Sequence, residues 1–261
     1  MVSQNKVALA CMAHPDDVEF TCGGTLALLH QQGWEIHMAT MTPGDCGSDQ
    51  LGREEISRIR RVEAAQAAAV LEGTYHCLEC PDGFIMYDPP TVAAAVKLVR
   101  EVRPALVFAA SPQDYLIDHE VASALVRNAA FFAGVPNLQT EPFGAFRPVP
   151  YLYYADAMEG KDLLGLPLDP TTIVDTSAVI ETKVRMLACH ASQRDWLLKQ
   201  HGMDEYTESM RTMGRRRGEL IGTAYAEGFR QHLGHGYPQD NLLARELGRL
   251  VHERPLRSAA L

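Results

Sequence analysis

The sequence predicts an α/β fold built on a mostly parallel sheet with helices on both faces. Two observations carry this prediction. Short apolar runs alternate with segments of helical periodicity through the first half of the 261 residues. The connections between successive runs are long enough to hold a helix, which favours right-handed crossovers and a parallel sheet. We therefore predict a Rossmann-like layer over residues 1–135.

The first strand is expected over Lys6–Ala13, which is continuously apolar and typical of a strand buried on both faces. Gly23 and Gly24 are expected to form the turn after this strand, before a helix over Thr25–Gln32. The remaining strands of this half are predicted at Ile36–Thr42, Tyr75–Cys80 and Ala105–Ala110. The remaining helices are predicted at Glu54–Leu71, at Thr91–Val102, and from a cap at Asp118 to Phe132.

The composition of the chain changes after Pro136. Five more prolines follow up to Pro170 and predict irregular chain, with late strands at Tyr151–Ala155 and Thr172–Asp175. Helices are expected at Ala178–Cys189, near Arg194–His201 and at Met203–Gly222. Because the sequence has no internal repeat and no low-complexity linker, we predict one domain over residues 1–261. Residues 136–261 are then a C-terminal elaboration that completes the site.

Composition and charge narrow the class of protein. Hydrophobic residues make up 46% and charged residues 22%, which is typical of a soluble globular protein, and no apolar run approaches the length of a bilayer span. The net charge of −9 argues against nucleic acid and anionic membranes as partners. Six scattered cysteines fit a reducing compartment, and the N-terminus lacks the pattern of a signal peptide. We therefore expect a cytoplasmic protein.

Chemically active side chains follow three of the predicted strands. They lie in His14-Pro15-Asp16-Asp17, in the loop 42–48, and in the segment 114–119, which ends in Asp118-His119. Because ligands of an open parallel sheet collect at the carboxyl ends of its strands, we expect the three segments at one edge. Two histidines and one carboxylate are a common ligand set for catalytic zinc, and a second carboxylate can act as general base. Taken singly, each residue also has a structural interpretation, as a loop histidine or a helix cap.

The motif Ala13-His14-Pro15-Asp16-Asp17, followed by Cys22-Gly23-Gly24-Thr25-Leu26, resembles the opening of the LmbE-like, PIG-L family of zinc-dependent deacetylases. Further matches lie at Thr42-Pro43-Gly44 with Gly47, Arg60 with Glu63, Pro81-Asp82-Gly83, Asp118-His119, His190-Ala191-Ser192-Gln193 and Tyr225-Ala226-Glu227-Gly228-Phe229. The resemblance extends over about residues 5–230.

This resemblance implies a Rossmann-like fold and hydrolysis of an N-acyl group, usually the N-acetyl group of an amino sugar or its conjugate. It implies that His14, Asp17 and His119 hold Zn²⁺ and that Asp16 activates water as general base. The partner is then a small N-acetylated molecule, and the trimers and hexamers formed by family members suggest a homo-oligomer. The substrate-binding residues that we expect are Arg60, Tyr115 and Asp82.

One position departs from the family pattern. Many members have His-Pro-Asp-His where this chain has Leu116-Ile117-Asp118-His119, and their first histidine helps to stabilise the oxyanion or to supply a proton. Because leucine cannot donate a hydrogen bond, we expect another residue to take this task. His190 is the first candidate, since some relatives have a tyrosine with a proposed oxyanion role at that position, and Tyr115 is the second. The alternatives are that His190 only ends a helix and that Arg60 only forms a surface ion pair with Glu63.

Other functions stay open on the sequence. An amidase acting on a larger acyl group or a thiol conjugate fits the same motifs. A metal-binding protein with little catalysis fits the loss of the histidine at Leu116, although Asp16 argues against it. A nucleotide-binding protein fits the fold but not the glycines, because Gly23-Gly24 is not part of a G-x-G-x-x-G motif. The same ligands bind iron or manganese as well as zinc.

Overall fold

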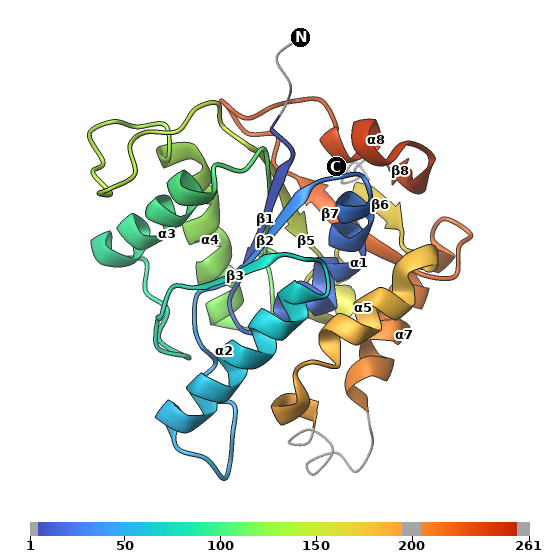
Figure 1. The fold of residues 1–261 in the computed structure, drawn as a ribbon. Coiled ribbons are helices and arrows are strands. Elements are labelled where there is room, and N and C mark those ends of the chain that lie inside the picture. The colour runs from blue at the N-terminus through green and yellow to red at the C-terminus, as the bar shows by residue number, and fades with distance from the viewer. Residues whose placement is uncertain (1–4, 195–204, 255–261) are drawn as a thin grey trace.

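The structure is a computed structural model that describes residues 5–194 and 205–254. Within them, eight strands form one sheet in the order β3-β2-β1-β4-β5-β7-β6-β8 (Figure 1). Neighbouring strands from β3 to β5 are parallel, whereas β7, β6 and β8 are added through antiparallel pairs. The prediction of a mostly parallel α/β sheet is therefore confirmed. The strands are β1 (Val7–Met12), β2 (Glu35–Thr40), β3 (Thr74–Cys77), β4 (Leu106–Ala109), β5 (Tyr151–Ala155), β6 (Thr172–Asp175), β7 (Ala226–Gln231) and β8 (Val251–Glu253).

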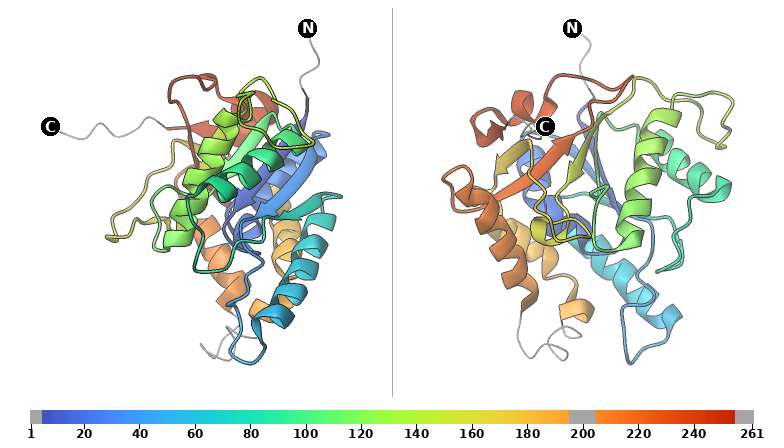
Figure 2. Two further views of the ribbon diagram at one scale, coloured as in Figure 1. Left: turned by 90° about the vertical axis from the view of Figure 1, so that its left-hand side faces the viewer. Right: turned by 180° about the vertical axis from the view of Figure 1, so that it is seen from behind.

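Helices cover both faces of the sheet (Figure 2). They are α1 (Asp17–Gln31), α2 (Arg53–Ala69), α3 (Pro89–Val102), α4 (Ile117–Phe132), α5 (Ile180–Leu187), α7 (Glu205–Glu219) and α8 (Leu242–Leu247), with short 3₁₀ helices at Met158–Gly160, Ser177–Val179 and Gly248–Leu250. Alternate residues of β1 pack against different helices: Ala8, Ala10 and Met12 face α1 and α8, and Val7, Leu9 and Cys11 face α3 and α4. The continuous apolar run of β1 is therefore explained by burial on both faces.

The prediction of a turn at Gly23 and Gly24 is wrong, because both residues lie inside α1. A Cβ atom at Gly24 would lie 2.9 Å from Glu227 Oε1 and from the Thr176 side chain. Glu227 accepts hydrogen bonds from the amides of Gly24 and Thr25, and its Oε1 lies 2.6 Å from Lys183 Nζ. Glycine is therefore needed here for close packing around a buried ion pair. Nothing local to Gly24 indicates this partner, which lies 203 positions later.

Other boundaries also differ from the predictions. Leu116, not Asp118, caps α4, and the Asp118 side chain instead accepts a hydrogen bond from the Gly83 amide. The sequence predicted β5 and β6 but not β7, α8 and β8, because the buried strand β7 has the mixed sequence AEGFRQ without a regular alternation. Apart from Arg194, the helix predicted near Arg194–His201 lies outside the described residues.

The register of the central strands brings three loops to one edge. Met12 pairs with Thr40 at the ends of β1 and β2, and Cys11 pairs with Ala109 in β4. The segments that follow β1, β2 and β4 therefore begin side by side at the carboxyl edge of the sheet, as the sequence predicted.

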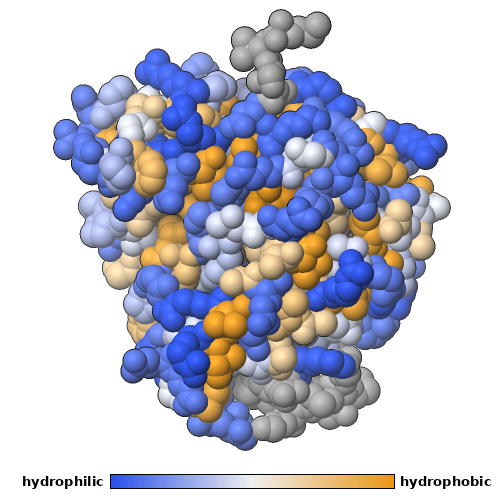
Figure 3. All heavy atoms as spheres, in the orientation of Figure 1, coloured by the Kyte–Doolittle hydropathy of each residue, from blue (hydrophilic) through white to orange (hydrophobic). Residues whose placement is uncertain are grey.

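Polar and charged side chains cover most of the face shown in Figure 3, with apolar patches between them. Among the described residues, every helix is too short or too polar to cross a lipid bilayer.

Candidate active site

A sharp change of backbone direction places two adjacent aspartates at the start of α1. Asp16 has a left-handed backbone (φ 100°) between β1 and α1, and the Asp17 side chain accepts a hydrogen bond from the His14 amide at 2.8 Å. The two carboxylates consequently have different neighbours. Asp17 lies against His14 and His119, and Asp16 lies against Tyr206.

His14, Asp17 and His119 form a cluster at this edge that could hold a metal ion. One ligand atom from each of the three residues lies within 4.8 Å of the other two. Asp17 Oδ2 lies 3.4 Å from His14 Nδ1 and 3.5 Å from His119 Nε2, and all three residues are buried. Two imidazoles and one carboxylate are the donor set of many catalytic zinc sites, so the cluster fits a metal ion.

The outer nitrogens of both histidines face carboxylates. His14 Nε2 lies 3.1 Å from Asp82 Oδ1 and 3.4 Å from Asp118 Oδ2, and His119 Nδ1 lies 3.0 Å from Asp114 Oδ1. Metal-binding histidines usually have such a partner on the nitrogen that does not bind the metal. His14, Asp82 and Asp118 could also group around an ion, but Asp82 and Asp118 already accept backbone hydrogen bonds. His14 Nδ1 and His119 Nε2 are therefore the better-suited ligand atoms.

The electrostatics of the cluster favour positive charge. Burial alone would raise the pKa of the Asp17 carboxyl, but His119 and His14 lower it below its usual range. Burial alone would lower the pKa of His14, but the carboxylates of Asp118, Asp17 and Asp82 raise it well above its usual value. A site that stabilises a cation on its imidazoles in this way also attracts a metal cation.

Asp16 has a different environment from its neighbour. Its Oδ2 accepts a hydrogen bond from the Tyr206 hydroxyl at 2.7 Å and lies 3.4 Å from Arg60 Nη2. Burial raises the pKa of Asp16, and this effect outweighs the opposing effect of Arg60. No local sequence pattern indicates Tyr206, because this residue lies on α7, 190 positions away from Asp16.

Arg60 is buried and supports the loops of the site. Its Nη2 donates to the Pro15 carbonyl at 2.7 Å and its Nη1 donates to the Gly44 carbonyl at 3.2 Å. A Cβ atom at Gly44 would overlap the Arg60 guanidinium, which explains the glycine of the loop after β2. The alternative ion pair between Arg60 and Glu63 is wrong, because Glu63 accepts hydrogen bonds from Ser192 instead.

The structure does not bring His190 to the substrate side of the site. His190 is fully buried, and its Nε2 lies 2.9 Å from Glu19 Oε1. The expectation that it contacts the acyl group is therefore corrected, since it does not line the cavity in front of Asp16. Tyr115 does line this cavity, where it is 67% exposed and its ring meets the His119 ring edge-on at 5.6 Å.

A cavity of about 430 Å³, here called the inner cavity, lies in front of these groups. The predicted residues that line it are His14, Asp16, Asp17, Arg60, Asp82, Tyr115 and His119. Gln193, Ser209 and Tyr206 also line the cavity and were not predicted as site residues. A buried cluster that could hold a cation and a carboxylate of raised pKa thus line one cavity that is large enough for a small molecule.

Comparison with known proteins identifies the class. Residues 9–130, which include His14, Asp17 and His119, match the family model PIG-L, described as GlcNAc-PI de-N-acetylase. This part of the chain therefore matches the PIG-L, LmbE-like family that its motifs predicted.

Individual relatives extend the likeness over most of the chain. Diacetylchitobiose deacetylase of Thermococcus kodakarensis is 26% identical, over 86% of this chain and 82% of that protein. The structure of N,N'-diacetylchitobiose deacetylase from Pyrococcus horikoshii is also 26% identical, with a TM-score of 0.74, and covers 88% of this chain and 84% of its own. The 4-oxalmesaconate hydratase of Pseudomonas putida is again 26% identical, over 74% of this chain and 76% of that protein. Because a hydratase is as similar in sequence as the deacetylases, the chemistry of the site has to support the assignment of the reaction.

Proposed function

We propose that the chain is a metal-dependent deacetylase that removes the N-acetyl group from an amino-sugar substrate. The observation that carries this proposal is the cluster of His14, Asp17 and His119 with a second carboxylate, Asp16, in the same cavity. A site that only binds a metal and a ligand does not need a second carboxylate held at this position. The names of the relatives from Thermococcus kodakarensis and Pyrococcus horikoshii, both diacetylchitobiose deacetylases, support the same reaction.

The ion that we propose is Zn²⁺, held by His14, Asp17 and His119. The donor set and the carboxylates behind both histidines support this choice. When bound, zinc supplies a Lewis acid for the acyl carbonyl and lowers the pKa of water towards neutrality.

Asp16 is the proposed general base. It takes one proton of the attacking water and returns it to the nitrogen as the C–N bond breaks. The products are acetic acid and an amine, which at neutral pH are present as acetate and the protonated amine. Tyr206 and Arg60 hold its carboxylate from one side. The raised pKa of Asp16, caused by burial, makes it a stronger base than an exposed aspartate.

The remaining predicted residues receive more specific roles. Tyr115 is the proposed donor to the acyl oxygen in place of the histidine absent at Leu116, because its ring stands beside His119 at the cavity wall. Asp82 orients His14, and Arg60 positions the loop of Asp16, rather than either of them binding the substrate alone. A cytoplasmic location and a homo-oligomeric assembly stay predictions from the sequence.

The test combines metal analysis with an assay of acetate release. Wild-type protein and the Asp16→Asn variant are purified with zinc and assayed with N-acetylglucosamine and N,N'-diacetylchitobiose. We expect about one zinc per chain in both proteins and acetate release only in the wild type. Zinc-loaded wild type that releases no acetate but hydrates an unsaturated dicarboxylate would assign the hydratase reaction instead.

A further inference from the structure

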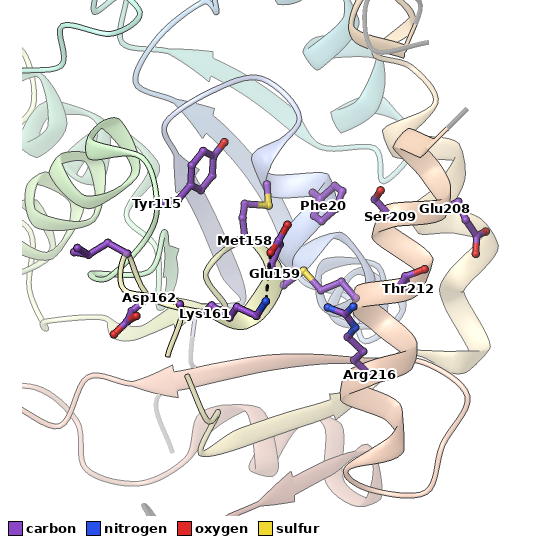
Figure 4. Close-up of a pocket in the computed structure, with 13 residues that line it drawn as sticks. Phe20, Tyr115, Met158, Glu159, Lys161, Asp162, Glu208, Ser209, Thr212 and Arg216 are labelled. Carbon is purple, nitrogen blue, oxygen red and sulfur yellow. Dashed lines mark ion pairs between the residues drawn. The ribbon is translucent and has the colours of Figure 1, made fainter. Parts of the chain in front are cut away.

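A second, larger cavity adjoins the inner cavity. This outer cavity, of about 1070 Å³, lies between α7 and the loop that follows β5 (Figure 4). It shares four lining residues with the inner cavity: Phe20, Tyr115, Met158 and Ser209. A molecule whose acyl group lies at the metal cluster can therefore extend directly into the outer cavity.

Most of the charged side chains that line the outer cavity already have partners. Lys161 Nζ lies 3.7 Å from Glu159 Oε2, and Glu208 accepts a hydrogen bond from Arg215 at 2.7 Å. Asp162 Oδ1 accepts hydrogen bonds from two backbone amides of its own loop. These groups are thus used within the protein.

Arg216 is different. It follows Arg215, which pairs with Glu208, and precedes Arg217, whose Nε donates to Asp156 Oδ2 at 2.5 Å. Arg216 lines the outer cavity and has neither an ion pair nor a hydrogen bond with any residue in the ranges 5–194 and 205–254. Figure 4 shows its side chain extending from α7 towards the space between the helix and the loop. In a chain of net charge −9, Arg216 is therefore a cationic group that the described residues leave available for a ligand.

Three of the residues shared by the two cavities form an apolar surface, on which the middle of a ligand that extends through both cavities could pack. Phe20, Met158 and Tyr115 line both cavities, and Figure 4 shows Phe20 beside Met158 with Tyr115 to one side. Aromatic and thioether side chains present an apolar surface on which the flat face of a sugar ring can pack.

We propose that the outer cavity binds the far end of the substrate and that Arg216 recognises an anionic group there, a phosphate or a carboxylate. The substrate class is then an N-acetylated amino sugar joined to a second, negatively charged unit. A guanidinium forms paired hydrogen bonds with either group. This inference rests on the proposed function for the position of the acyl group, but binding tests it separately from catalysis.

The test measures binding by calorimetry to the zinc-loaded Asp16→Asn protein, in which no turnover is expected. The probes are disaccharides, since the outer cavity lies beyond the inner one: N,N'-diacetylchitobiose, its 6-phosphate, and a disaccharide of N-acetylglucosamine and glucuronic acid. We expect at least one anionic probe to bind about tenfold or more tightly than the neutral one at low salt, the size of a charge-assisted contact. The anionic probe that binds more tightly shows whether the site recognises a phosphate or a carboxylate.

Two further substitutions assign the preference to the residue. Arg216→Gln should remove it and leave the affinity for the neutral probe unchanged, and Arg216→Lys should restore part of it. Arg211→Gln is the matched control, because Arg211 lies on the same helix and pairs with Glu181 outside the cavity.

Equal binding of charged and neutral probes, a preference that survives Arg216→Gln, or no binding of any probe would overturn the inference. Acetate release from the neutral disaccharide without any anionic preference would leave the proposed function standing alone. Anionic preference without acetate release from any probe by the wild type would leave the binding site standing and reject the deacetylase.

Discussion

The inner and outer cavities are built in opposite ways. In the inner cavity the charged side chains are largely buried and in contact with one another, as in the cluster of His14, Asp17 and His119. In the outer cavity the charged side chains are mostly exposed and come from a loop and one helix face. Groups that are fixed by their neighbours can place a reacting atom, whereas exposed groups can change without disturbing the fold. The comparison suggests that the inner cavity sets the reaction and the outer cavity sets the substrate.

The largest effect is expected from removing an inner ligand. His119→Ala deletes one of three proposed metal ligands, so zinc content and acetate release should both fall to background. Elemental analysis and an acetate assay measure the two losses. Full zinc content in this variant would show that the ion is held elsewhere.

A smaller effect on zinc binding is expected from Asp114, which contacts the proposed ligand His119 rather than the metal itself. Asp114→Asn keeps the shape of the side chain that faces His119 Nδ1 but removes its charge. We expect zinc affinity to fall about 10- to 100-fold, which is typical for such supporting carboxylates. Competition with a chelator measures it. An unchanged zinc affinity would mean that the proposed nitrogen assignment of His119 is wrong.

Tyr206→Phe tests the group that holds the base. Losing one hydrogen bond to a carboxylate should lower kcat about 10- to 100-fold, while KM and zinc content stay near their wild-type values. Steady-state kinetics separate the two parameters. Tyr115→Phe is the informative comparison, because a contact with the acyl oxygen should lower kcat without involving Asp16.

The smallest effect on stability is expected in the loop that follows β5 and lines the outer cavity. Leu163 is 64% exposed, so Leu163→Ser should change the free energy of unfolding by no more than about 0.5 kcal/mol. Urea unfolding measures this change, with Lys183→Met as the contrast. That variant leaves Glu227 buried without its cation and should cost about 3 kcal/mol or more. Similar losses of unfolding free energy in the two variants would show that the exposed loop is as important for stability as the buried ion pair.

The predictions from sequence succeeded where the determining residues are close together in the chain. The apolar run of β1 and the motif after it predicted both the parallel sheet and the edge at which His14, Asp16 and Asp17 gather. The predictions failed where contacts with a residue distant in the sequence determine the local structure. Glu227 explains why a glycine is needed at position 24 inside α1, and Tyr206 reaches Asp16 from α7. His190 belongs to a matching motif, yet its pairing with Glu19 takes it out of the cavity.

Tyr206 and Arg216 lie on the same helix, one facing each cavity. They are ten positions apart, and a helix rises about 1.5 Å per residue, so their backbones are separated by roughly 15 Å along the axis. α7 therefore sets a molecular length: a substrate that reaches both ends has to be longer than a single sugar ring. A one-residue insertion between Ser209 and Arg216 would turn Arg216 by about 100° around the axis and away from the cavity, without inserting between any residues that line the inner cavity.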